Sequence, residues 1–340
     1  MEMKRKRLIN ISKAIGKYLF RVLTLLLATS VVAFVLASLS PIDPVQQYVM
    51  GAGAVSMEQR EAISEYWGLN APPTERYLNW LSAILRGDMG VSILYRQPVA
   101  YIIADRFINT FALMMTSWIL SGIIGFTLGC IMGIWRGKWV DSIIKRVCLV
   151  LCSVPTFWLG LVFLLIFSVW LGWFPIGFSS PIGIADSDVS IWQRLYHLAL
   201  PALTLSFISF ANVAMHTRQK LVDVLESDYV LFARARGEDT WTIMKRHGFR
   251  NTLLPAITLQ FASFAELFGG SVLAENVFSY PGLGSAVSAA GLNSDVPLLL
   301  GITLFSALFV FSGNFIANII YGVVDPRIGE ERPHGQAIGD

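Results

Sequence analysis

Long apolar runs alternate with shorter polar intervals along the 340-residue chain. Six of these runs are about as long as an α-helix must be to cross the roughly 30 Å hydrocarbon core of a bilayer. The runs occupy residues 18–39, 109–134, 147–171, 198–217, 256–274 and 297–322. The pattern therefore predicts an all-α, polytopic membrane protein with six transmembrane helices.

Two of the runs carry local signals of their own. The second contains Gly122, Gly125, Gly129 and Gly133, a spacing of small residues that lets membrane helices approach closely. The third is interrupted by Pro155, which removes a backbone hydrogen bond and predicts a kink. The first run is longer than the apolar core of a signal peptide and is interpreted as a span.

The polar intervals divide the chain into four parts. Residues 1–39 are a basic N-terminus with the first span, 40–107 an insert, 108–324 a core with five spans, and 325–340 a polar tail. The insert is too long for a tight hairpin. A rigid turn is expected at 40–44, and Ser56 and Thr74 are placed to begin two short helices, so a small helical cap is predicted.

The longest polar interval of the C-terminal half follows the fourth run. Ser227 or Asp228 can cap a first short helix that stops at Gly237, and Asp239 or Thr240 can cap a second. A helix, a glycine break and a second helix predict a compact knob. Its apolar residues would need a partner protein to cover them.

Composition and charge give this pattern a direction across the membrane. The chain is 54% hydrophobic and only 14% charged, which excludes an ordinary soluble domain. Twenty of its 26 Lys and Arg residues lie in the N-terminal segment, the loop after the second run, residues 218–255 and the tail. Positive residues favour the cytoplasm, so both termini and 218–255 are predicted inside and the insert outside.

The chain lacks the motifs of an ATPase or a metalloprotease. No Gly-x-x-x-x-Gly-Lys-Ser/Thr and no His-Glu-x-x-His occurs in it, so ATP hydrolysis by that device must lie in another chain. The three cysteines, Cys130, Cys148 and Cys152, lie in or beside apolar runs and do not predict a disulfide framework. We expect neither a catalytic centre nor a bound cofactor or metal, and no nucleic-acid partner.

One acidic residue, Glu266, falls in the middle of the fifth run. A carboxylate near the bilayer centre costs several kcal/mol unless it faces a cavity or a partner. Either Glu266 lines a pathway and meets a cationic or metal-containing substrate, or it is a structural clamp that is protonated or hydrogen-bonded to another helix.

Several motifs together resemble a known family. The strings ARARG at 233–237 and HGFRNTLLP at 247–255 resemble the cytoplasmic coupling loop of ABC-transporter permeases of the dipeptide/oligopeptide/nickel branch. The family's Glu-Ala-Ala opening is replaced here, and 17 residues separate Gly237 from Pro255, a longer gap that is similar to the peptide/nickel branch. The strings RGDMG at 86–90 and FSYPGLG at 278–284 resemble the family's external insert and re-entrant outer loop, although the second can also be a simple connector.

The resemblance implies a type I ABC importer permease in a bacterial inner membrane that forms half of a translocation pathway. It implies as partners a second permease, two ATPase subunits that bind ATP, an external substrate-binding protein and the lipid bilayer. The implied site residues are those of the coupling loop, 218–255, and of the outer turn. They are Ala233, Ala235 and Gly237 for close packing, Arg234, Arg236 and Arg250 for polar contacts, Pro255 at the loop's end, and Pro281, Gly282 and Gly284 in the turn.

The substrate is less well determined than the class. The strings AELFGG at 265–270 and ENVF at 275–278 resemble nickel-type permeases, so nickel or a metal–chelate complex is the first expectation and a peptide the alternative. Two rivals of other classes are a self-sufficient secondary transporter and a membrane-anchored binding protein that works through its insert. Deletion of 238–247 separates them, because only the permease needs the knob for transport.

Overall fold

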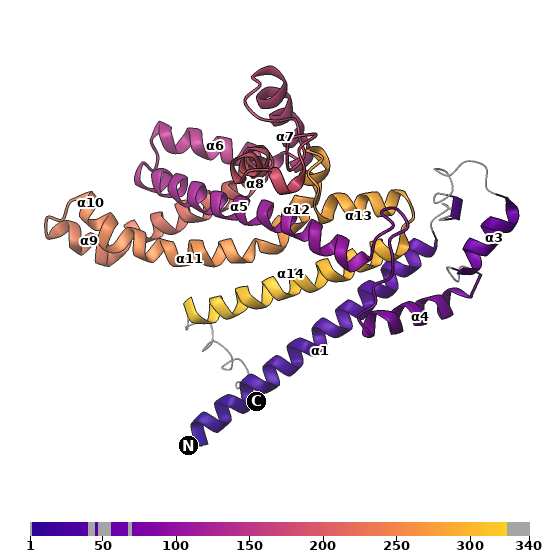
Figure 1. The fold of residues 1–340 in the computed structure, drawn as a ribbon. Coiled ribbons are helices and arrows are strands. Elements are labelled where there is room, and N and C mark those ends of the chain that lie inside the picture. The colour runs from indigo at the N-terminus through magenta and orange to yellow at the C-terminus, as the bar shows by residue number, and fades with distance from the viewer. Residues whose placement is uncertain (1, 40–44, 47–55, 67–69, 325–340) are drawn as a thin grey trace. The chain divides into compact units, whose positions relative to one another are not determined.

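The computed structural model describes residues 2–39, 45–46, 56–66 and 70–324. Over these residues the chain is all-α, with one isolated bridge between Val91 and Pro98. The predicted turn at 40–44 and the tail 325–340 lie outside the described residues. The elements, with the 3-10 and π segments marked η, are α1 (Glu2–Ser38), α3 (Met57–Tyr66), α4 (Pro73–Leu85), α5 (Val99–Ile134), α6 (Trp139–Ser153), α7 (Thr156–Phe163), η1 (Leu164–Trp170), η2 (Asp186–Asp188), α8 (Ile191–Leu225), α9 (Asp228–Ala235), α10 (Thr240–Ile243), η3 (Met244–Gly248), α11 (Phe249–Ala262), α12 (Phe264–Val277), α13 (Leu283–Leu292) and α14 (Val296–Val324) (Figure 1).

Within the described ranges, six stretches are long and apolar enough to cross a membrane if each bent helix pair counts as one span. Three are single helices, in α1, α5 and α14, and three are pairs bent by more than 40°. The bends are 111° between α6 and α7, 45° within α8 and 52° between α11 and α12. The predicted break at Pro155 is confirmed, whereas the break at Ser263, which splits the fifth run, was not predicted.

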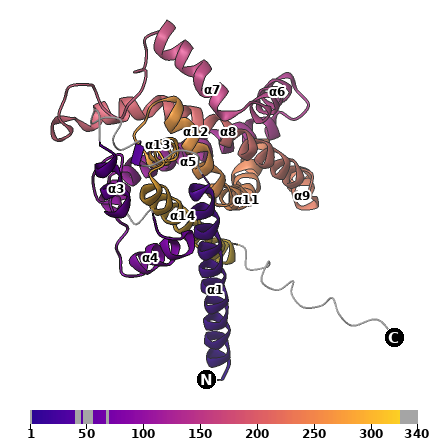
Figure 2. The same ribbon diagram turned by 90° about the vertical axis from the view of Figure 1, so that its right-hand side faces the viewer.

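One compact unit comprises residues 1–108 and 283–311. In it α4 packs on α1, where the hydroxyls of Ser30 and Tyr77 are 2.8 Å apart (Figures 1 and 2). Ser56, which was expected to begin a helix, caps α3: its hydroxyl accepts from the Gln59 N–H, and the Gln59 side-chain oxygen accepts from the Ser56 N–H. Helix α5 begins at Val99, so the last nine residues assigned to the 40–107 insert belong to the second span's helix instead. Helices α5, α13 and α14 share this unit's buried core.

The other unit comprises residues 109–282 and 312–340. Its α5 and α8 approach closely because three glycines of α5 face α8. A Cβ at Gly125 would lie 2.7 Å from Val213, and one at Gly129 would lie 2.5 Å from Thr217. Real Cβ atoms do not come so close, so these positions need glycine, and the prediction of close packing is confirmed.

Candidate functional site

The predicted knob, residues 226–250, joins the end of α8 to the start of α11. Ser227 stands at the N-cap of α9, but its hydroxyl donates to the Val224 carbonyl at 2.5 Å and does not cap the helix. At the other end Gly237 has φ +83°, a conformation that glycine adopts without strain. The Glu238 and Gly237 N–H groups donate to the Ala233 and Arg234 carbonyls, which is the Schellman pattern of helix termination.

Asp239 caps α10, as predicted. Its carboxylate accepts from the Trp241 and Thr242 N–H groups at 3.1 and 3.4 Å and from the Thr242 hydroxyl at 2.5 Å. These donors, the Thr242 hydroxyl first among them, hold the pKa of Asp239 below its usual value. The chain thus reverses within the four residues between α9 and α10.

The knob has a small core of its own. Val230, Ala233 and Ile243 are buried together, packed against Val224 and Leu225 at the end of α8. Ala233, which was expected to serve close packing, has its side chain inside this chain. Ala235 and Gly237 are exposed, and open space surrounds the position of a Cβ at Gly237.

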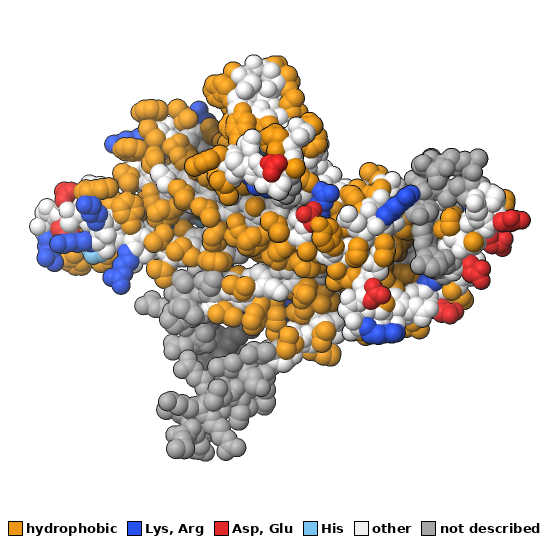
Figure 3. All heavy atoms as spheres, in the orientation of Figure 1, with side chains coloured by type: hydrophobic (Ala, Val, Ile, Leu, Met, Phe, Trp, Pro, Cys, Tyr) orange, Lys and Arg blue, Asp and Glu red, His pale blue; other side chains and the backbone are white. Residues whose placement is uncertain are grey.

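The outer surface of the knob is apolar and basic. Leu231, Phe232 and Trp241 are 65%, 71% and 56% exposed. Arg234, Arg236 and Arg250 are also exposed, and within the described part of the chain none of the three makes an ion pair. Lys245 instead lies over the Trp241 ring, and Arg246 pairs with Glu238 at 3.3 Å. Figure 3 shows Lys and Arg gathered at the end of the molecule that carries α9 and α10.

The knob's second half continues into the membrane helix without a loop. A π-helical turn, η3, leads into α11 at Phe249, so Pro255 lies inside α11 and does not end the stretch as predicted. The non-helical part of the predicted loop 218–255 is confined to 226–227 and 236–239. The knob is therefore joined to both helices with very little irregular chain.

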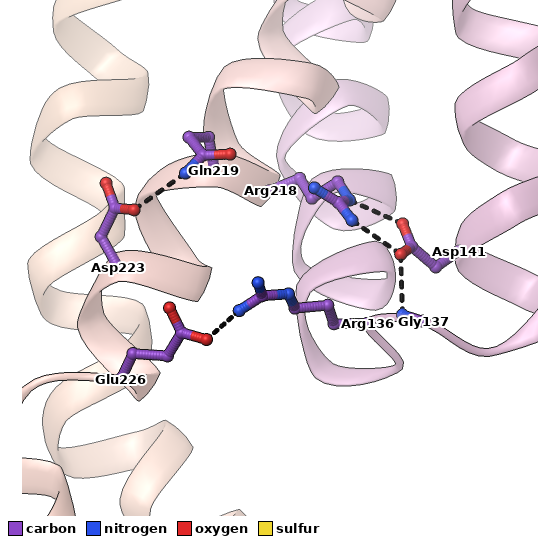
Figure 4. Close-up of polar contacts among 7 residues, drawn as sticks. All are labelled: Arg136, Gly137, Asp141, Arg218, Gln219, Asp223 and Glu226. Atoms are coloured by element: carbon purple, nitrogen blue, oxygen red, sulfur yellow. Dashed lines mark hydrogen bonds and ion pairs between the residues drawn. The ribbon is translucent and has the colours of Figure 1, made fainter.

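A largely buried ion pair joins α6 to α8 (Figure 4). The Arg218 guanidinium, on α8, donates to both Asp141 carboxylate oxygens at 2.6 and 2.7 Å, and the Gly137 N–H donates to Asp141 at 3.0 Å. Beside it Arg136 pairs with Glu226. The sequence analysis counted Arg218 only among the basic residues of 218–255 and gave no role to Asp141. Asp141 follows Gly137 by four residues, in a turn that leads into a helix. This local pattern indicates a contact between Asp141 and the backbone of the turn and does not indicate a partner on α8.

Two neighbouring acids, Glu266 in the fifth run and Glu275 just after its end, lie in opposite surroundings. Glu266 is exposed, in the first turn of α12. Glu275, to which the sequence gave no separate role, is fully buried and accepts from the Thr110 hydroxyl at 2.7 Å. A Cβ at Gly282 would lie 2.3–2.4 Å from the Glu275 carboxylate, so the turn closes on that group.

The predicted outer turn is tight, as expected, at Tyr280–Gly282, where the Gly282 N–H donates to the Tyr280 carbonyl at 2.8 Å. Asn109 donates to the Pro281 carbonyl at 2.9 Å. Gly284, placed in the turn by the sequence, lies inside α13 instead. Burial and the Glu275 carboxylate raise the pKa of Tyr280 to about 12, against an opposing effect of Arg194.

Among the described residues, no group of three or more His, Cys, Asp or Glu side chains could hold a metal ion. The chemistry of the arrangement is that of binding surfaces: an exposed apolar and cationic knob, a largely buried ion pair between α6 and α8, and an exposed carboxylate on a bent membrane helix.

The chain is similar to one known family and to several known proteins. Residues 125–330 match the family described as "Binding-protein-dependent transport system inner membrane component". The chain is 36% identical over 305 residues to the oligopeptide transport system permease protein AppB of Bacillus subtilis (strain 168), covering 89% of this chain and 95% of that one. It is 34% identical over 314 residues to the glutathione transport system permease protein GsiC of Escherichia coli (strain K12), covering 92% and 97%. A solved amino acid ABC transporter is similar with a TM-score of 0.48, at 14% identity over 65% of this chain and 92% of that one.

Proposed function

The chain belongs to the binding-protein-dependent transport system inner membrane component family and is the permease component of an ABC importer, and on this premise we propose that it forms half of a pathway for short peptides. The other half is a second, related permease chain. ATPase subunits and a substrate-binding protein belong to an importer of this class. We place the assembly in a bacterial inner membrane with both termini of this chain in the cytoplasm, because 20 of its 26 basic residues lie on that side in the predicted topology.

The peptide assignment is supported by the relatives. AppB is named for oligopeptides and GsiC for glutathione, which is itself a short peptide. Nickel, the first expectation from the sequence, is supported only by Glu266 and the short strings around it. The relatives therefore favour the alternative that the sequence ranked second.

The knob is the proposed contact with the ATPase subunits. The single observation that carries this proposal is its outer surface, which exposes Leu231, Phe232 and Trp241. The same segment carries Arg234, Arg236 and Arg250, which make no ion pair within the described residues. Apolar side chains anchor an interface in a pocket, and charges around them set orientation and association rate. When the ATPases close on ATP, the knob moves and displaces α8 and α11, to which it is directly joined.

The test is a double variant at the knob, Leu231→Ala with Phe232→Ala. We expect the ATPase subunits to be lost on purification, together with ATP-driven uptake, while membrane insertion is retained. The control is Trp192→Ala, an exposed apolar residue at the start of α8. A secondary transporter would keep its uptake in the double variant, and that result would overturn the proposal.

The substrate is tested in liposomes that hold the assembled importer and its binding protein. Uptake of a labelled tetrapeptide, of glutathione and of radioactive Ni²⁺ is compared with and without ATP. We expect ATP-dependent uptake of at least one peptide and none of Ni²⁺. ATP-dependent Ni²⁺ uptake in the absence of peptide uptake would restore the nickel assignment.

A further inference from the structure

The unit that includes residues 109–282 contains an apolar pocket between α5, α8 and α11. Its volume is about 310 Å³, at the lower end of the roughly 300–1,000 Å³ that small-molecule sites occupy. Two of its lining residues, Ile123 and Leu253, are exposed, so the pocket opens at the surface of this unit. None of the described residues that line it is charged. Its walls include Trp118, Gly122 and Phe126 of α5, Val213 of α8, and Ile257 and Gln260 of α11.

Gln260 brings an unsatisfied acceptor to this apolar pocket. The side chain is buried, and its Nε2 donates to the Trp118 carbonyl at 2.6 Å and to the Ser121 hydroxyl at 2.9 Å. These bonds fix the orientation of the amide, because the reverse orientation would set its oxygen against the Trp118 carbonyl oxygen. Gln260 Oε1 is buried, and no described residue donates to it. Such an acceptor is costly, and the hydrocarbon core of a bilayer offers no water to satisfy it.

Gly122 keeps space open beside the Gln260 amide. Unlike Gly125 and Gly129, it is not required by the approach of α8 to α5. A Cβ at Gly122 would lie 3.4 Å from Cδ, 3.5 Å from Nε2 and 3.7 Å from Oε1 of Gln260, which is ordinary van der Waals contact. Glycine inside a helix is less favourable than alanine. What glycine provides at this position is free volume in the pocket.

The pocket adjoins a break in a membrane helix. Gln260 lies three residues before Ser263, where the chain bends by 52° from α11 into α12. Its backbone carbonyl accepts from the Trp118 indole N–H and from the Ser263 hydroxyl, both at 2.9 Å. Discontinuous membrane helices commonly form substrate sites. Oε1 is covered in this conformation, so a donor reaches it when α11 shifts against α5, and α11 is one of the two helices that the knob joins.

We propose that this pocket binds an apolar side chain of the peptide in transit and that Gln260 Oε1 accepts a hydrogen bond from the backbone N–H of the same peptide residue. The apolar walls remove the side chain from water, and the N–H satisfies the buried acceptor. A lipid chain could fill the pocket but has no donor for Oε1. The uncharged walls offer no ligand set to Ni²⁺. This inference rests on the proposed peptide importer and names the class of side chain that its pathway accepts.

The first test introduces a thiol at the pocket with Ile257→Cys, a position that is 37% exposed. The background carries Cys152→Ala, because Cys152 is exposed whereas Cys130 and Cys148 are buried. The assembled importer in liposomes is treated with the water-soluble reagent methanethiosulfonate ethylammonium, with and without ATP. We expect the introduced thiol to react in at least one nucleotide state, because the thiolate that reacts forms only where water enters. Absence of reaction in every state would mean that lipid or the second permease covers the pocket, and would overturn the proposal.

Peptide protection of the same thiol tests what the pocket holds. A tetrapeptide with one phenylalanine should slow the reaction, whereas tetraglycine should not. The same phenylalanine peptide with a methyl group on the phenylalanine backbone nitrogen should protect less, because it has lost the donor for Gln260. Equal protection by the methylated peptide would remove Gln260 from the contact. Equal protection by tetraglycine, or protection by neither peptide, would overturn the side-chain site.

The second test reduces the pocket with Gly122→Ala, which the structure accommodates without a clash. We expect uptake of the phenylalanine peptide to fall about fivefold while that of tetraglycine is unchanged, because the added methyl group takes space from the larger side chain. Gly269→Ala is the matched control, since this glycine of α12 has open space around it, and it should change neither uptake.

The two proposals fail in different ways. A wild-type importer that carries no peptide would overturn the proposed function and the pocket's role with it. An importer that carries both peptides, but whose uptake ratio is unchanged in Gly122→Ala and whose thiol is not protected, would keep the proposed function and lose the pocket.

Discussion

Arg218 of α8 and the two arginines of α9 show how burial divides one residue type between two kinds of surroundings. Arg218 lies inside, with its side chain 15% exposed and both of its hydrogen bonds directed to Asp141. Arg234 and Arg236, on α9, are exposed and make no described ion pair. Arg218 pairs with Asp141 of another helix of this chain, whereas the two arginines of α9 make no ion pair within the described residues. The basic residues of one stretch should therefore be separated into those that pair within the chain and those that do not, before the stretch is assigned to an interface.

The largest effect on stability is expected from Asp141→Ala, which removes the carboxylate that pairs with Arg218. It leaves the Arg218 charge buried without its carboxylate, which costs about 3 kcal/mol of stability. Thermal unfolding of the purified chain in detergent measures this loss. The double variant Asp141→Ala with Arg218→Met should recover most of it, because a buried pair can be replaced by apolar side chains. A single variant as stable as the wild type would show that the pair does not hold α6 to α8.

Gly282→Ala tests the buried Glu275 carboxylate in the same way. The added methyl group would lie within 2.4 Å of the carboxylate, so the turn must shift, at a cost of about 2 kcal/mol. Gly291→Ala is the matched control, since open space surrounds that position. Unfolding midpoints of the two variants should differ clearly. Equal midpoints would mean that the turn moves away from Glu275 at no cost.

Removal of the exposed arginines should weaken partner binding and leave the stability of the chain almost unchanged. Arg234→Ala with Arg236→Ala should change the free energy of unfolding by no more than about 0.5 kcal/mol. The same variant should weaken ATPase binding about tenfold at low salt and less at high salt, because exposed charges are screened. Titration of the ATPase subunits against the detergent-solubilised permease at two salt concentrations measures both effects. Binding that is unchanged at low salt would remove these arginines from the interface.

The smallest effect is expected at Asp239. Its pKa is lowered in the folded protein, so the cap contributes stability above the unfolded-state pKa of about 4 and loses it as pH falls through the lower folded-state value. Between pH 5 and 8 the knob should therefore keep the same protection against proteolysis. Asp239→Ala should increase cleavage near residue 239 at pH 7, and Asp239→Asn, which can still cap, should not. A rise in wild-type cleavage between pH 8 and 5 would contradict this assignment.

Much of the fold could be read from local sequence. Helical membrane runs, the break at Pro155, the capping by Asp239, the turn at Gly237 and the glycine face of α5 all follow from hydropathy or from backbone preferences of single residues. These signals act within a few residues of where they occur. Most of them therefore appear in the structure, although the Ser227 hydroxyl turns to the Val224 carbonyl and does not cap α9.

The candidate sites depended on contacts that no local pattern contains. Hydropathy and residue type predicted that a basic knob would follow the fourth span, but only the tertiary structure turned Ala233 inward and joined Arg218 to Asp141, 77 residues away. It likewise buried Glu275 and left Glu266 exposed. The physical reason is that burial and charge pairing are set by which helix faces meet, and a sequence position alone does not determine its neighbour across the fold.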